Sequence, residues 1–198
     1  MGIYATKPKW QKALKPLVAF CVLRGVHPDF FTYGALLLSF IAGMAFYLAR
    51  ENRGYLWLVP PCVLLRLLFN LMDGQIARNM ELENSWGEVK NEFGDRIADS
   101  IIFLGLAFGG YADARLVALV LALILSVSYL GILSKAISGT RLYKGVFAKG
   151  DRMISLALFT FYPLVTANLE SFNFYLVFAA LAAIVTIIQR LGSIDGFT

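Results

Sequence analysis

Long apolar stretches separated by short polar segments dominate this chain. Six of them are close to the length of about 20 residues that a helix needs to cross the roughly 30 Å hydrocarbon core of a bilayer. They occupy residues 30–49, 55–76, 92–110, 114–136, 153–168 and 173–190. The pattern therefore predicts six transmembrane helices.

The N-terminal segment has a different pattern. Residues 7–24 combine a basic first half with a short apolar stretch that Arg24 closes, and no small-residue cleavage site follows. This pattern does not fit a secretory signal peptide. We expect residues 1–28 to form an amphipathic interfacial helix and a turn on the membrane surface.

Composition supports a membrane protein. Hydrophobic residues make up 59% of the 198 residues, and the mean hydropathy is +0.68, whereas soluble domains are about 45–50% apolar. The connections are short, and no repeat or linker divides the chain. The prediction is an all-α integral membrane protein with a single domain over residues 1–198, of which 29–198 is the six-helix transmembrane part.

Basic residues are unevenly distributed between the two sides. With the N-terminus inside, 14 of the 18 Lys and Arg residues fall inside, and three, Arg50, Arg53 and Arg115, fall outside. Positively charged loops stay in the cytoplasm, so both termini are expected there, in a bacterial cytoplasmic membrane. The net charge of +5 would face anionic lipid or a phosphorylated substrate; no contiguous basic groove suggests nucleic acid.

The sequence lacks the residues of several common sites. Its only histidine, His27, and its two cysteines, Cys21 and Cys62, do not make a usual zinc site. No Ser-His-Asp set, P-loop or Rossmann glycine pattern occurs.

Polar residues instead form stripes on two neighbouring helices. Arg66, Asn70 and Asp73 share one face near the end of the second apolar stretch. A second stripe, with a spacing of four, contains Gly87, Asn91, Asp95 and Asp99. A charge at mid-membrane costs roughly 2.5–3.5 kcal/mol, so several of them predict a functional site. A buried structural ion pair is the alternative.

These side chains suit a phosphate-binding metal site. Carboxylate and amide oxygens without His or Cys favour a hard cation such as Mg²⁺ or Mn²⁺. Gly74, Ala77 and Gly87 would let a ligand approach the helix backbone, and Arg78 adds a positive charge. The combination predicts a pyrophosphate site.

The same residues resemble the signature of the CDP-alcohol phosphotransferase (CDP-alcohol phosphatidyltransferase) family. That signature is D-x-x-D-G-x-x-A-R, eight or nine residues, then G-x-x-x-D-x-x-x-D. The chain has this spacing, with Asn70, Asp73, Gly74, Ala77 and Arg78 in the first part and, after eight residues, Gly87, Asn91 and Asp95 in the second. Six membrane helices after an interfacial helix are also similar to the family, so the resemblance covers most of the chain.

Two of the four acidic positions differ from the signature. Asn70 and Asn91 stand where Asp is usual, as in a bacterial branch of the family. Asparagine still offers one neutral oxygen, but two negative charges are missing. Whether one or two metal ions bind stays open.

A second alignment of the signature is also possible. Asp95 and Asp99 by themselves have the spacing of the final acidic pair, which would make Asp99 the reactive carboxylate. However, Arg66 lies one turn deeper than Asn70, as Asp99 lies one turn deeper than Asp95, on antiparallel helices. We therefore expect a structural Arg66–Asp99 pair beneath the metal site and favour Asp95 as the reactive carboxylate.

The resemblance implies an enzyme of phospholipid biosynthesis. It would transfer a phosphatidyl group from CDP-diacylglycerol, or a similar CDP-lipid, to a small alcohol and release CMP, with Asp73 and Asp95 as catalytic residues and Asp95 as the base. The implied ligands of Mg²⁺ or Mn²⁺ are Asn70, Asp73, Asn91 and Asp95, with Asp99 in the second alignment. The implied CDP-binding residues are Gly74, Ala77, Arg78 and Gly87.

Five basic residues indicate the class of acceptor. Lys135, Arg141, Lys149, Arg152 and Arg190 fall on the same predicted side as the site. Family members with phosphorylated acceptors have basic residues in similar places, so we expect a phosphorylated polyol such as inositol phosphate or glycerol phosphate. Membrane topology and contact with lipid headgroups are the alternative explanation for these charges.

Two other functions stay open. A catalytically weak relative that acts as a scaffold in lipid synthesis would explain Asn70 and Asn91. A small cation transporter could also carry intramembrane carboxylates, although it would need them near the midplane. The oligomeric state also stays open, with a homodimer as one option.

Overall fold

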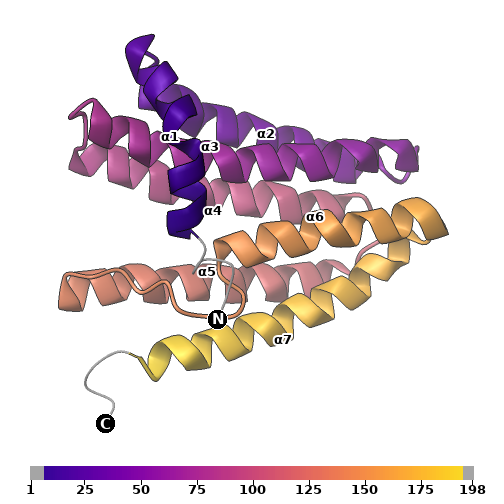
Figure 1. The fold of residues 1–198 in the computed structure, drawn as a ribbon. Helices are drawn as coiled ribbons and strands as arrows, with labels where there is room; N and C mark the ends of the chain where they lie inside the picture. The colour runs from indigo at the N-terminus through magenta and orange to yellow at the C-terminus, as the bar shows by residue number, and fades with distance from the viewer. Residues whose placement is uncertain (1–6, 194–198) are drawn as a thin grey trace.

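The structure is a computed structural model and describes residues 7–193. Within that range all regular elements are helical (Figure 1). The α-helices are α1 (Lys7–Leu23), α2 (Pro28–Leu48), α3 (Val59–Asn79), α4 (Ser85–Phe108), α5 (Ala114–Ser138), α6 (Lys149–Thr166) and α7 (Phe172–Leu191). Two short 3₁₀ helices, η2 (Arg53–Leu58) and η3 (Leu169–Ser171), precede α3 and α7.

Each of the six apolar stretches forms a helix: the second begins with η2 before α3, and α4 and α6 begin at least four residues before their apolar stretches. The fourth helix, α4, begins at Ser85 because the side chain of Asn84 caps it, accepting a hydrogen bond from Gly87 N at 2.7 Å. Helix α6 begins at Lys149, where Asp151 accepts a hydrogen bond from the backbone N–H of Ala148 at 3.2 Å. Both helices therefore extend beyond their apolar stretches into polar sequence.

Four segments of the described chain are long and apolar enough to cross a membrane. They are Pro28–Leu48, Arg53–Asn79, Ala114–Ser138 and Leu169–Leu191. Helices α4 and α6 are not among these four, and they contain charged residues, including Asp95 and Asp99 in α4 and Asp151 and Arg152 in α6. The all-helical fold with several membrane-length helices is thus present, whereas the count of six spans stays a prediction.

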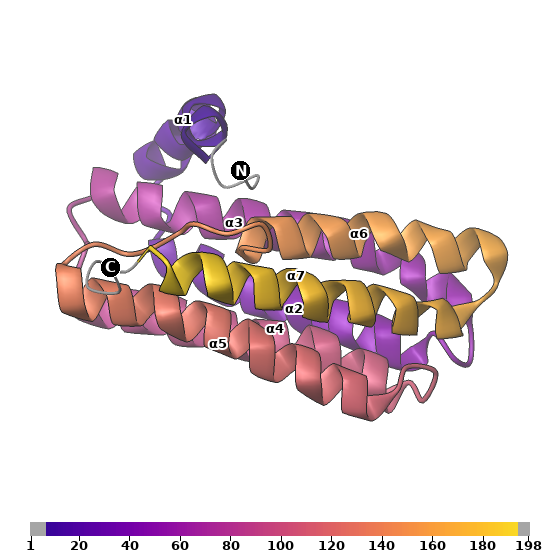
Figure 2. The same cartoon turned by 90° about the horizontal axis from the view of Figure 1, so that it is seen from below.

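The long helices run side by side, and α1 lies across them (Figures 1 and 2). Helix α2 packs against α3 and α4, α5 against α7, and α6 against α3. The α2–α4 contact is close because Gly43 and Gly105 face each other: a Cβ atom on Gly105 would lie 2.2 Å from the carbonyl oxygen of Gly43. Small residues at such crossings let helix backbones approach.

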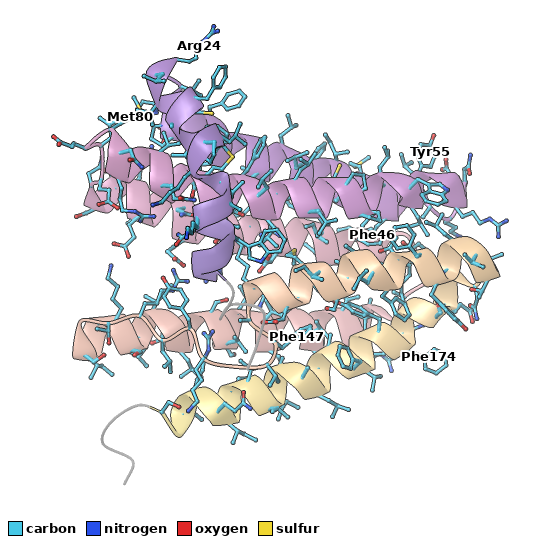
Figure 3. The ribbon with its side chains drawn as sticks, viewed as in Figure 1. Arg24, Phe46, Tyr55, Met80, Phe147 and Phe174 are labelled. Carbon is cyan, nitrogen blue, oxygen red and sulfur yellow. The ribbon has the colours of Figure 1, made fainter. Side chains whose placement is uncertain are left out.

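The two ends of the bundle differ in character. Phe46 and Tyr55 lie toward one end, and Met80, at the end of α3, lies toward the other (Figure 3). The ring of Phe46 packs edge-on against Phe172, with centroids 5.3 Å apart, in the apolar core. Nitrogen and oxygen atoms gather instead around the Met80 end (Figure 3). The polar stripes of α3 and α4 therefore lie toward one end of the bundle.

Helix α1 packs on α3 near this polar end. Val18 and Cys21 are buried in a small apolar cluster with Phe31, Met72 and Ile76. Cys62 is also buried, in the main core, and both cysteines are free thiols.

Candidate active site

The deepest polar group is a triad of charges, which we call the charged triad: Arg66, Asp99 and Arg152. Arg66 Nη2 lies 2.7 Å from Asp99 Oδ1, so the contact predicted from the two stripes is present. Arg152 Nη2 lies 2.6 Å from Asp99 Oδ2. All three residues are at most 1% exposed. Asp99 therefore has both carboxylate oxygens bound to guanidinium groups.

Arg66 also joins this layer to the next one. Its Nη2 atom donates to the backbone carbonyl of Asp95 at 3.3 Å and lies 4.0 Å from the Asp95 carboxylate. Its Nη1 atom lies 3.0 Å from the sulfur of Met153. The Nε atoms of Arg66 and Arg152 have no hydrogen-bond partner in the described structure. Charges in this layer are thus held by few, well-defined contacts.

One turn nearer the polar end lies a second group, the cavity cluster: Asn70, Asp73, Asp95 and Lys149. Lys149, at the start of α6, donates to Asn70 Oδ1 at 2.8 Å and to the Asp95 carboxylate. Asp73 accepts from its neighbour Gly74 N at 2.6 Å and from the hydroxyl of Thr32 at 3.4 Å. Helices α3, α4 and α6 supply this cluster, and Thr32 of α2 contacts it.

A cavity of about 1040 Å³ opens over the cavity cluster. It collects most of the residues predicted from the sequence: Asn70, Asp73, Gly74, Ala77, Arg78, Gly87, Asn91, Asp95, Lys135, Arg141, Lys149, Arg152 and Arg190. In the part of the chain that is described, Arg66 and Asp99 are not among its lining residues. The charged triad thus forms the floor, and Arg152 alone of its members reaches the cavity.

The small residues of the signature leave space on the cavity side. A Cβ atom on Gly74 would meet only the guanidinium of Arg78, at 3.7 Å, and one on Gly87 only Asn84, at 3.5 Å. Neither glycine is required by helix packing, unlike Gly43 and Gly105. Their open faces are suited to a ligand.

All five basic residues predicted for the acceptor line the cavity, and all five already have protein partners. Lys135 binds Glu88, and Arg141 binds Glu92 with Nη2 at 2.9 Å from Oε2. Arg190 donates from Nε to the carbonyl of Lys144 at 2.8 Å, and from Nη1 to that of Val127. Lys149 and Arg152 bind the carboxylates of Asp95 and Asp99. An anionic ligand would have to share or displace these partners.

Several cavity residues were not identified from the sequence. Thr32 comes from α2, and its only sequence signal is a hydroxyl in an apolar helix. Glu88 binds Lys135 near the end of α5, and Glu92 binds Arg141 in the loop between α5 and α6. The ammonium of Lys90 donates to both carboxylate oxygens of Asp29, each at 2.6 Å, and so links α4 to the start of α2.

The donor atoms fit a hard cation. Within residues 7–193 no three His, Cys, Asp or Glu side chains are grouped to hold a metal ion. The available ligands are the two carboxylates of Asp73 and Asp95 with the amide oxygens of Asn70 and Asn91, all of which line the cavity. Oxygen-only donors of this kind suit Mg²⁺ or Mn²⁺.

The bundle thus combines helices long and apolar enough to cross a membrane with a cavity of about 1040 Å³ that carboxylate, amide, basic and leucine side chains border, as expected of a membrane enzyme that acts on a lipid substrate. A model of the family described as CDP-alcohol phosphatidyltransferase matches residues 25–188. The chain belongs to this family and is therefore a membrane transferase of phospholipid biosynthesis.

Known relatives and solved structures support this assignment. Inner membrane protein YnbA of Escherichia coli (strain K12) is 32% identical over 158 residues, covering 80% of this chain and 78% of the relative. Phosphatidylinositol phosphate synthase of Mycolicibacterium smegmatis is 25% identical over 204 residues, covering 96% and 86%. The similarity to YnbA supports a location in the bacterial inner membrane.

The fold is shared with a solved enzyme structure. Mycobacterium tuberculosis phosphatidylinositol phosphate synthase (PgsA1) with CDP-DAG bound superposes with a TM-score of 0.71 at 22% identity, covering 91% of this chain and 92% of that one. The same protein in complex with manganese and citrate gives 0.67 at 21% identity, covering 91% and 88%.

Proposed function

We propose that this chain transfers the phosphatidyl group of CDP-diacylglycerol to a phosphorylated polyol, with inositol phosphate preferred over glycerol phosphate, and releases CMP. One observation carries the proposal: the carboxylates of Asp73 and Asp95 and a wall of basic side chains border the same cavity. Phosphatidylinositol phosphate synthases among the relatives, and a neighbour that binds CDP-DAG, support the choice of substrates.

The CDP portion is assigned to the signature face of α3 and the start of α4. Gly74, Ala77 and Gly87 give it room to lie against the helices, and Arg78 offers a half-exposed guanidinium, 3.5 Å from Glu83. The acyl chains leave along the apolar part of the same cavity, where Leu64, Leu65, Leu67, Leu68 and Leu71 of α3 lie.

A divalent cation, Mg²⁺ or Mn²⁺, would be held by oxygens of Asn70, Asp73, Asn91 and Asp95. When bound, it would neutralise the pyrophosphate of the CDP-lipid and orient it for displacement. A neighbour crystallised with manganese supports this assignment.

Asp95 is the proposed general base. Its carboxylate would take the proton of the acceptor hydroxyl as that oxygen attacks the lipid-side phosphorus. The bond from this phosphorus to the bridging oxygen breaks, and the oxygen leaves with CMP. Phosphoryl transfer depends mainly on positioning and charge neutralisation, which Asp73, held by Gly74 N and Thr32, and Lys149 would supply.

Asp99 is not the proposed base. It is fully buried, it does not border the cavity among the described residues, and both of its oxygens bind guanidinium groups. An acceptor hydroxyl would have to enter the bundle interior to reach it. The alignment of the signature that ends at Asp95 is therefore preferred.

The acceptor phosphate is assigned to the basic wall of the cavity, which consists of Lys135, Arg141, Lys149, Arg152 and Arg190. A phosphate would share these cations with their present partners. The more exposed pairs, Lys135–Glu88 and Arg141–Glu92, are easier to exchange than Arg152–Asp99, because their charges are less desolvated.

CMP release by the purified chain tests the proposal. The full chain in detergent is incubated with CDP-diacylglycerol, Mn²⁺ and one acceptor at a time: inositol phosphate, glycerol phosphate, inositol, glycerol or serine. Inositol phosphate should give the fastest release, and chelation of Mn²⁺ should stop it. Faster release with an unphosphorylated acceptor would reject the acceptor assignment. No release with any acceptor, from correctly folded protein, would favour the scaffold.

The membrane arrangement is proposed with the activity. Six transmembrane helices follow an interfacial α1, with both termini in the cytoplasm. In a chain without its native thiols, Glu51→Cys should react with an impermeant maleimide added to intact cells, and Glu83→Cys should react only after lysis. The reverse labelling would overturn the orientation. Both residues are exposed and lie in connections between helices.

A further inference from the structure

The two carboxylates of the cavity cluster have different electrostatic surroundings. Asp95 is bound by Lys149 and lies 4.0 Å from Arg66 and 3.8 Å from Arg96. Asp73 takes part in no ion pair of residues 7–193; it accepts only from a backbone N–H and a hydroxyl. One side of the cluster thus already holds a cation, and the other side has a buried anion without one.

Lys149 reaches the cluster because of where α6 begins. It is the first residue of that helix, and its ammonium bridges Asn70 of α3 and Asp95 of α4. Asn70 and Asp95 are two of the four signature positions expected to supply metal ligands. A lysine ammonium is a compact point charge with three donors, so it can occupy a position between two oxygen ligands.

The charges of the site agree with this placement. The two buried layers contain three carboxylates, Asp73, Asp95 and Asp99. They also contain three cationic side chains, Arg66, Arg152 and Lys149, of which the last is 20% exposed. Arg96, 3.8 Å from Asp95, is paired with Glu92 at 3.3 Å, so that pair adds no net charge. Before any metal or substrate enters, the site is therefore balanced. One divalent cation would match the two negative charges of a CDP-lipid pyrophosphate, whereas two would leave an excess of positive charge in a region of low dielectric.

We propose that the Lys149 ammonium takes the place of one metal ion, so that this site binds a single divalent cation, on the Asp73 side. The amide of Asn70 is then matched to the lysine that it binds rather than to a second metal. Lys149 also serves as a positioning residue, because it fixes the carboxylate of Asp95. This inference rests on the proposed metal-dependent transfer.

Counting bound Mn²⁺ tests the inference without measuring activity. The full chain in detergent is titrated with Mn²⁺ alone, and free Mn²⁺ is followed by its electron paramagnetic resonance signal. The wild type should bind one Mn²⁺ per chain. The triple variant Lys149→Gln, Asn70→Asp, Asn91→Asp should bind two, since it removes the ammonium and restores two carboxylates. Lys144→Gln is the matched control, because Lys144 binds Ser193 instead of the site, and should bind one.

Each outcome has a separate meaning. Two ions on the wild type, or one ion on a folded triple variant, would overturn the role of Lys149 and leave the proposed transfer intact. No bound ion on the wild type would overturn both. If the triple variant does not fold, Asn70→Asp alone decides: it should still bind one ion because Lys149 remains, and a count of two would reject the inference.

Discussion

The charged triad and the cavity cluster lie one helical turn apart and are built from the same helices, yet they differ in how their charges are satisfied. In the triad, Asp99 is completely buried and bound on both oxygens. In the cavity cluster, Asp73 and Asp95 are 4% and 7% exposed and border the cavity. The first layer has no free coordination position, and the second can exchange its partners for a ligand.

This difference teaches that an intramembrane charge is not by itself evidence for catalysis. Buried ion pairs are expensive to desolvate and are strongly destabilising when one partner is removed. A carboxylate that keeps contact with an aqueous cavity can instead bind a cation or accept a proton. Access to the cavity, more than the presence of charge, separates the structural layer from the reactive one.

Removing the central anion of the triad should have the largest effect on stability. Asp99→Leu leaves Arg66 and Arg152 buried without their carboxylate, and breaking a buried pair costs about 3–5 kcal/mol. We expect a much lower melting temperature in detergent and poor expression. Asp73→Leu, at a carboxylate outside any described ion pair, should lower the melting temperature less. Equal losses for the two variants would contradict the comparison.

Rescue of Asp99→Leu sharpens the same comparison. From the sequence alone, Arg66→Leu would be expected to compensate, because only that pair was predicted. The second guanidinium at Asp99 changes this expectation, since Arg152 would still be stranded. Only the triple variant, with leucine at Arg66, Asp99 and Arg152, should recover most of the lost melting temperature. Full recovery by the double variant Asp99→Leu, Arg66→Leu would mean that Arg152 is not part of the triad.

Alanine substitutions at two glycines should distinguish helix packing from ligand binding, with a smaller effect on stability than Asp99→Leu. Gly105→Ala places a methyl group against the backbone of Gly43 and should cost about 1–3 kcal/mol. Gly74→Ala meets only a flexible guanidinium, so the melting temperature should stay near that of the wild type while KM for the CDP-lipid rises. If Gly74→Ala lowers the melting temperature as much as Gly105→Ala does, Gly74 is a packing residue.

Breaking the ion pair between Arg141, in the loop between α5 and α6, and Glu92 of α4 should give the smallest change in stability. It is partly exposed, at 25% and 17%, and such pairs contribute about 0–1 kcal/mol. Arg141→Gln should therefore melt close to the wild type. KM for the phosphorylated acceptor should rise about fivefold, equivalent to roughly 1 kcal/mol, with Lys144→Gln as the control. An unchanged KM would remove Arg141 from the acceptor site.

Sequence reasoning was most successful where a single helix defines the geometry. The six apolar stretches correspond to helices α2 to α7. The Arg66–Asp99 contact followed from spacings of four on two antiparallel helices joined by a short loop, because such a connection fixes which turns lie at the same depth.

Contacts between helices far apart in the sequence were not predictable in the same way. Lys149 and Arg152 were assigned to the acceptor from their charge and side of the membrane, but their places beside Asp95 and Asp99 depend on how α6 packs on α3. Thr32 reaches Asp73 only because α2 packs on α3. No spacing within one helix contains this information.

The central claim is that Asp95 reacts while Asp99 supports the structure. The most direct test measures CMP release from CDP-diacylglycerol per folded molecule for the wild type, Asp95→Asn and Asp99→Asn, together with their melting temperatures. Asp95→Asn leaves the partly exposed Lys149 without its carboxylate, so it should melt between Asp99→Asn and the wild type, and it should lose about 10²–10⁴-fold in rate, the usual contribution of a general base. Asp99→Asn should melt earlier and keep most of its rate while folded. A stable, inactive Asp99→Asn beside an active Asp95→Asn would contradict the account.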